Sequence, residues 1–181
     1  MFASRQKSSE LTSVLGIDPG LTRCGYAILQ VSGNTEISLT SLGVLRTSPD
    51  QELPDRLAEI AQEVEALLDE FQPSAVAVEH IFFQANVRTA MSVGQVSGLV
   101  LSAAARRGVS VVQYSPNQVK LAVAGWGGAD KAQVQKMVKQ RLKLNSLPKP
   151  ADAADAAAIA LCHIASHPLA MKIAQTQMVS R

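Results

Sequence analysis

Four acidic residues stand at places where the chain has little structural use for a carboxylate. Asp18 ends the apolar run SVLGID, and Glu79 ends the apolar run AVAVE. Asp152 and Asp155 lie three residues apart in ADAADAAAIALCH, a spacing that puts both on one face of a helix. Each has an ordinary explanation when taken alone, as a turn residue, a loop acid or an acid near a positive helix N-terminus.

Taken together, the four acids indicate metal-assisted chemistry. If the strands that end at Asp18 and Glu79 are neighbours, both carboxylates lie at the sheet edge where open α/β sheets bind ligands. Four acids gathered there would repel one another, and hard divalent cations would relieve the repulsion. Oxygen ligands without cysteine favour Mg²⁺ or Mn²⁺, and a pair of such ions suits phosphoryl displacement. His163 lies about 12 Å along the helix axis from Asp155, so we expect it outside the site.

The rest of the sequence predicts the elements that would position these acids. Apolar or alternating runs predict strands at residues 13–18, 24–31, 35–46, 75–79 and 108–114. Helical spacing and caps predict helices at residues 53–71, about 86–107, from 116 onward with Ser115 as its cap, 130–143 and 151–167. Short turns join the first three strands as an antiparallel meander, and the later strands are parallel because helices separate them. We expect an α/β fold with a mixed five-stranded sheet flanked by helices on both faces.

Length and composition limit the class of protein. The 181 residues suit one domain, and a hydrophobic fraction of 47% supports a sizeable core. We expect a flexible tail over 1–12, the folded domain over 13–167 and a frayed tail over 168–181. No apolar run is long enough for a membrane span, and the polar N-terminus lacks a signal-peptide centre, so we expect a cytoplasmic protein. The two cysteines, Cys24 and Cys162, match no zinc or redox spacing and are expected in the core.

Charge is distributed unevenly although the net charge is only +2. Residues 50–70 carry eight acids and one base, whereas residues 120–149 carry seven bases and one acid. This polarity fits a molecule that presents one face to an anion such as nucleic acid. Two solvated helices of opposite sign explain the same pattern, and charge alone does not separate the two interpretations.

Several separated motifs resemble those of the RuvC family of crossover-junction endodeoxyribonucleases. They are IDPGLTRCGYAI, AVAVEHIFF, the pair Gly94-Gln95, PNQVK, the G-x-G-x-A-x-K of residues 125–131 and PADAADAAAIALCH. The match covers about residues 13–165 in the family's order. The resemblance implies an RNase H-like fold and a homodimer that cuts Holliday junctions symmetrically with divalent metal in DNA recombination and repair. It also implies RuvA and RuvB, the branch-migration proteins, as partners.

The resemblance assigns roles to particular residues. Asp18, Glu79, Asp152 and Asp155 become the catalytic, metal-binding acids, with Asp18 shared between two ions, Mg²⁺ or Mn²⁺. The products would carry a 5′-phosphate and a 3′-hydroxyl. GQVSG, residues 94–98, would form part of the dimer interface, although packing on the chain's own sheet explains the same small residues.

Six further residues are candidates for contact with DNA. Lys120 and Lys131 match family positions near the cut, and Phe82 takes the place of an aromatic that stacks on an unpaired base. We add Arg88, Lys136 and Lys139 as hypothetical DNA contacts. The alternatives are ordinary surface residues for the basic side chains and a packed ring for Phe82.

Two other functions remain open on the sequence. A related RNase H-like nuclease acting on structured RNA would share the fold and the acids. A non-catalytic nucleic-acid-binding module would share the fold but would have no use for four gathered acids. A sugar-kinase or actin-like ATPase also begins with a D-x-G strand, but 181 residues leave no room for its second subdomain.

Overall fold

The computed structural model describes residues 12–32, 36–80 and 87–166. Five strands and five helices follow one another in the described ranges. In chain order they are β1 (Thr12–Asp18), β2 (Arg23–Ser32), β3 (Glu36–Arg46), α1 (Leu53–Phe71), β4 (Ala75–Glu79), α2 (Val87–Arg106), β5 (Ser110–Tyr114), α3 (Pro116–Ala124), α4 (Lys131–Arg141) and α5 (Ala151–Ser166). The predicted elements are all confirmed, and most ends agree within two residues. The expected tails, apart from Thr12, lie outside the described residues.

The sheet has the strand order β3-β2-β1-β4-β5. β1, β2 and β3 pair antiparallel as a meander, and β1, β4 and β5 pair parallel. This confirms the predicted mixed sheet. Because β1 and β4 are parallel neighbours, their carboxyl ends lie side by side at one edge of the sheet.

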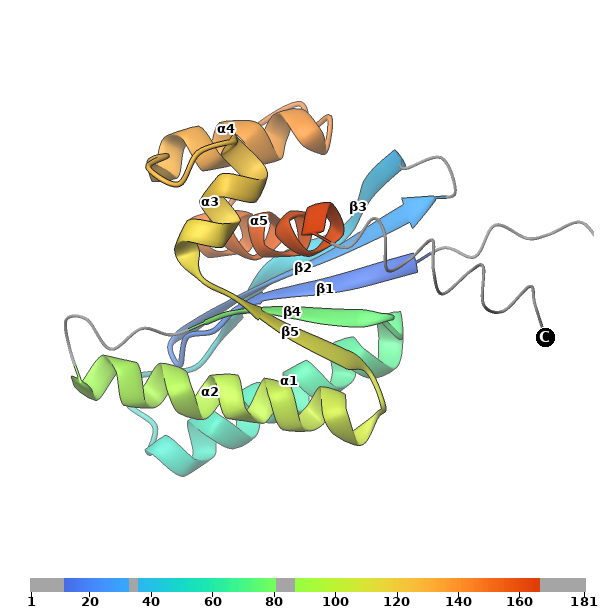
Figure 1. The fold of residues 1–181 in the computed structure, drawn as a ribbon. Helices are drawn as coiled ribbons and strands as arrows, with labels where there is room; N and C mark the ends of the chain where they lie inside the picture. Colours follow the sequence, from blue (N-terminus) through green and yellow to red (C-terminus); the bar gives the residue numbers. More distant parts are fainter. Residues whose placement is uncertain (1–11, 33–35, 81–86, 167–181) are drawn as a thin grey trace, which may run out of the picture.

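Helices cover both faces of the sheet (Figure 1). α1 and α2 pack on one face over a core that includes Ile17, Ile60 and Val96. α3, α4 and α5 pack on the other face over a core that includes Val14, Val138 and Ile159. No helix in the described ranges is long and apolar enough to cross a membrane.

α5 lies unusually close to the sheet because glycine faces it from two strands. A Cβ added at Gly16 would lie 2.2 Å from the Ala156 carbonyl oxygen, and one added at Gly25 would lie 2.1 Å from the Asp152 carbonyl oxygen. The small alanines of α5 allow the same close approach from the helix side. The first turn of α5 is therefore held directly against the end of the sheet.

The two helices that follow β5 are fixed at their N-termini by matching caps. Ser115 and Asp130 each form a capping box, with Gln118 and Gln133 respectively, so α3 and α4 both begin at defined residues. The cap at Ser115 was predicted. α4 ends at Arg141, two residues earlier than expected, and Lys143 beyond it has a left-handed backbone.

Candidate active site

Three elements bring the four predicted acids to one edge of the sheet. Asp18 and Glu79 are the last residues of the parallel neighbours β1 and β4, one step beyond the paired residues Ile17 and Val78. Asp152 and Asp155 lie in the first two turns of α5. Gly25 pairs with Asp18 across β1 and β2 and also touches the backbone of Asp152, so the helix and the strand end meet there.

The acids influence one another electrostatically. Burial, together with the negative charges of Glu79, Asp155 and Asp152, raises the pKa of Asp18 to about 7. Burial, followed by the charge of Asp155, also raises the pKa of Glu79. When ionised, these carboxylates repel one another, and a bound cation would relieve this repulsion.

Two basic side chains already pair with the acids of α5. Arg23 donates from Nε to Oδ2 of Asp152 at 2.7 Å, and Lys131 donates from Nζ to Oδ2 of Asp155 at 2.6 Å. The contact with Asp155 is the main cause that raises the pKa of Lys131. Lys131 was a predicted site residue. Arg23 was not predicted as a site residue. Its place within the motif IDPGLTRCGYAI, five residues after Asp18, was the signal that could have identified it.

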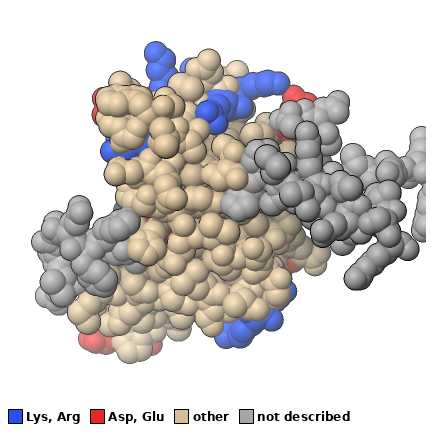
Figure 2. All heavy atoms as spheres, viewed as in Figure 1, with Lys and Arg blue, Asp and Glu red and all other residues tan. Residues whose placement is uncertain are grey.

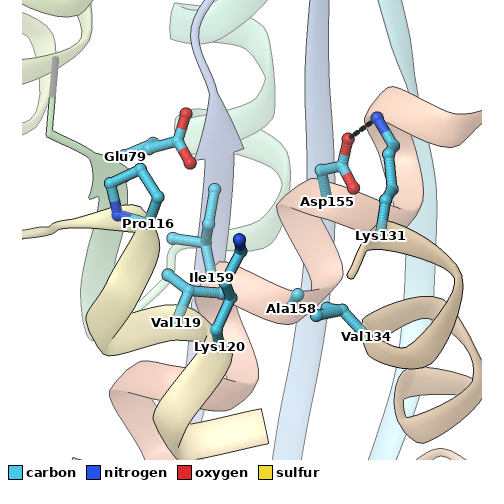
Figure 3. A pocket seen from close by; sticks show the side chains of 9 residues that line it. All are labelled: Glu79, Pro116, Val119, Lys120, Lys131, Val134, Asp155, Ala158 and Ile159. Atoms are coloured by element: carbon cyan, nitrogen blue, oxygen red, sulfur yellow. Dashed lines mark hydrogen bonds and ion pairs between the residues drawn. The ribbon is translucent and has the colours of Figure 1, made fainter. Parts of the chain in front are cut away.

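A pocket of about 220 Å³ opens beside these acids (Figure 3). Glu79, Lys120, Lys131 and Asp155 supply its charged groups, and side chains such as Ile159 form its apolar wall. Figure 3 shows Lys120 reaching from α3 toward the space between Glu79 and Asp155. The pocket therefore joins two of the four acids to the two lysines that match family positions near the cut.

The other predicted DNA contacts lie away from this group or outside the described residues. Lys136 is exposed and Lys139 is half-buried on α4, where Figure 2 shows Lys and Arg side chains gathered. At the lower end of the same view, where α1 and α2 lie, acidic side chains appear on the left and basic side chains on the right. Phe82 lies outside the described residues, and Arg88 falls in α2 with a side chain that the structure does not describe.

His163 and the two cysteines are buried in the protein. His163 is buried and its Nδ1 lies 3.0 Å from the Tyr114 hydroxyl oxygen, in a hydrogen bond between α5 and β5. Cys24 and Cys162 are both buried free thiols, as expected for small core residues.

The donor set suits hard divalent cations, because the four carboxylates offer only oxygen atoms. As they stand, no three His, Cys, Asp or Glu side chains in the described ranges are grouped so as to hold a metal ion. Asp152 and Asp155 are paired with Arg23 and Lys131 instead. The residues fit such ions in type and charge, and an ion held by three or four of them would need these ion pairs to open.

The fold defines an α/β protein of the RNase H-like class, and comparison with known proteins identifies its family. Residues 14–163 match the family model described as crossover junction endodeoxyribonuclease RuvC. The chain is 48% identical to the crossover junction endodeoxyribonuclease RuvC of Streptomyces griseus over 168 residues, which are 93% of this chain and 82% of that protein. The chain belongs to the RuvC family, which confirms the resemblance seen in its motifs.

Solved structures support the same assignment. Thermus thermophilus RuvC in complex with a Holliday junction substrate matches with a TM-score of 0.83 and 41% identity, over 88% of this chain and 96% of that one. The yeast mitochondrial Holliday junction resolvase Ydc2 matches with a TM-score of 0.65 and 16% identity, over 85% of this chain and 78% of that one. The second likeness shows that the fold is shared.

Proposed function

We propose that this protein is an endonuclease that resolves Holliday junctions by divalent-metal-dependent hydrolysis of phosphodiester bonds. The observation that carries the proposal is the meeting of four carboxylates at one sheet edge, two from strand ends and two from α5. The membership of the RuvC family of crossover junction endodeoxyribonucleases supports the choice of DNA junctions as substrate.

The chain's own residues have distinct parts in this proposal. Asp18 and Glu79 stand on a rigid sheet, while Asp152 and Asp155 stand on a helix that is clamped to it. Divalent ions, when bound by these acids, would supply the Lewis acidity that activates water and offsets charge on the scissile phosphate. Lys120, on the pocket wall, would neutralise charge on the DNA strand beside the cut.

Five further residues would contact the DNA. Lys131 would move between Asp155 and a phosphate, because its ammonium already lies at the carboxylates. Lys136 and Lys139 on α4 and Arg88 on α2 would contact the DNA backbone. Phe82 would stack on an unpaired junction base.

Symmetric cutting would follow from a two-fold homodimer, because a four-way junction has two-fold symmetry and two strands must be cut. α2 offers a suitable face: Met91 is 59% exposed, and a Cβ added at Gly94 or Gly98 would meet nothing within 4 Å. The cuts would leave 5′-phosphate and 3′-hydroxyl ends. RuvA and RuvB would act as partners that present the junction.

Substrate choice tests the proposal directly. The protein is incubated with an end-labelled four-way junction, a matched duplex and a structured RNA, each with Mg²⁺ or Mn²⁺. We expect paired, symmetric nicks in the junction alone, and ends that a DNA ligase reseals. Cleavage of RNA beside an intact junction would move the function to the alternative RNA nuclease, and tight junction binding without cutting would favour a binding module.

Metal binding has its own expected result, measured without DNA. Mg²⁺ or Mn²⁺ should raise the melting temperature in a concentration-dependent way, because an ion that binds only the folded state stabilises it by linkage. An ion present at a hundred times its Kd would add about 2.7 kcal/mol. Asp18→Asn should lose most of this increase, while Asp50→Asn, at an exposed acid distant in sequence from the site, should keep it. An equal increase in both variants would place the metal elsewhere.

A further inference from the structure

The loop between α3 and α4, residues 125–130, carries an exposed tryptophan that the proposed mechanism does not use. Trp126 is 55% exposed, and Leu121 in α3 is 58% exposed. An indole ring is among the largest apolar groups that a protein can bury, so leaving it in water forgoes substantial stabilisation. A partner that covers the ring would recover this stabilisation.

The loop backbone supports the ring on one side. A Cβ added at Gly128 would lie 2.2 Å from Cζ3 of Trp126 and 2.8 Å from its Cε3. Only a glycine at position 128 therefore leaves the six-membered ring where it lies against the loop. With one part of the ring held by the backbone and more than half of the side chain exposed, Trp126 is positioned for contact with a flat partner.

The same loop joins the two helices that carry the lysines of the candidate site. Lys120 on α3 lines the pocket with Glu79 and Asp155, and Lys131 begins α4 with its ammonium on Asp155. Figure 1 shows the loop on the same side of the molecule as the carboxyl ends of β1 and β4. α3 and α4 cover the sheet face opposite α2, so the loop and the dimer contact proposed for α2 lie on opposite sides of the sheet.

We propose that Trp126 contacts the DNA substrate by stacking its indole ring on an unpaired base of the strand bound beside the carboxylates. The inference rests on the proposed function, because it takes the partner to be the junction. Lysines on both sides in the chain, Lys120 and Lys131, would hold the phosphates, and an aromatic ring stacks on any base. A base inside a duplex has both faces occupied by its neighbours, so the partner of Trp126 is a base released at the branch point.

The chain contains one tryptophan, so its fluorescence reports on this position alone. The titration uses the Asp18→Asn protein with Mg²⁺, which keeps the DNA intact. Tryptophan emission is measured against a four-way junction and a matched duplex, and junction affinity is measured by the anisotropy of a labelled junction. We expect emission to be quenched on junction binding and less so on duplex binding.

Four substitutions, each added to the Asp18→Asn protein, separate the effect of the ring from that of its surroundings. Trp126→Ala should weaken junction affinity about 5- to 150-fold, and Trp126→Phe should keep most of the affinity, because a smaller ring still stacks. Gly128→Ala, which displaces the ring without removing it, should fall between them. Leu147→Ala removes another exposed apolar side chain, 45% exposed in the loop after α4, and should bind like the parent.

Two results would overturn the inference, and they have different consequences. Tight junction binding with unchanged emission, together with a Trp126→Ala affinity within twofold of the parent, would reject the stacking role and leave the proposed function intact. Failure of the parent to bind the junction, with no cutting by the unmodified protein, would reject both. Melting curves confirm that Trp126→Ala is folded, which we expect for a side chain that is 55% exposed.

Discussion

Asp18→Asn should abolish junction cleavage while leaving the protein folded and able to bind DNA. Asp18 ends β1, the central strand of the sheet, and the charges of Glu79, Asp155 and Asp152 all act on it. The substitution removes the one carboxylate on which the other three acids all act. Lewis-acid stabilisation is worth several kcal/mol and each 1.36 kcal/mol changes a rate tenfold, so we expect a fall on the order of a thousandfold or more.

The same substitution should stabilise the metal-free protein. The pKa of Asp18 is raised from 3.8 to about 7, so between about pH 4 and pH 7 the folded protein binds this proton more than the unfolded chain does. The free energy of unfolding therefore falls as pH rises through this range. Asparagine does not titrate, so the variant should lack this fall and be more stable above pH 7 by on the order of a few kcal/mol.

Paired measurements check both expectations for Asp18→Asn. Single-turnover cleavage of a junction is compared with melting curves between pH 4 and pH 8 in EDTA, and Asp50→Asn serves as the exposed control. The assignment of Asp18 would be wrong if the variant cut DNA within tenfold of the unmodified protein. The electrostatic argument would be wrong if the difference in melting temperature between the two proteins did not grow with pH.

Gly25→Ala should damage both stability and activity although position 25 bears no chemistry. The added Cβ would lie 2.1 Å from the carbonyl oxygen of Asp152 and 2.6 Å from its carbonyl carbon. Both are backbone atoms of α5, so the helix must move away from β2. Overpacking of this kind costs about 1–3 kcal/mol and sometimes more, which lowers the melting temperature by roughly 2–12 °C for a protein of this size.

The activity loss should exceed what the stability loss explains. Moving the first turn of α5 also moves Asp152 away from Asp18, and a misplacement of about 1 Å can cost a hundredfold in rate. Cleavage is therefore measured well below the melting temperature of each variant. For the melting temperature alone, Gly94→Ala is the matched control, because a Cβ there meets nothing within 4 Å of the same chain and alanine favours a helix by about 1 kcal/mol. Unchanged melting and cleavage in Gly25→Ala would show that α5 is not held by this contact.

The order and type of the elements were predictable from the sequence, because they depend on local patterns. The alternation and short turns of the first three strands gave the meander, and helical spacing gave α1 its observed bounds, Leu53–Phe71. The acids that end the apolar strands β1 and β4 were visible in the same way. Once β1 and β4 are parallel neighbours, Asp18 and Glu79 share an edge, so the sequence by itself determined the fold class and which acids to consider.

The tertiary structure decided which side chains those acids meet. Arg23 and Asp152 are 129 residues apart in the chain, and only the close packing of α5 on β2 brings them together. That packing depends on glycine at two strand positions facing one helix, which no periodicity reveals. The raised pKa of Asp18 and the exposure of Trp126 likewise follow from what surrounds each side chain in space. Spacing along the chain fixes local geometry, whereas burial and charge are sums over neighbours that only the folded chain defines.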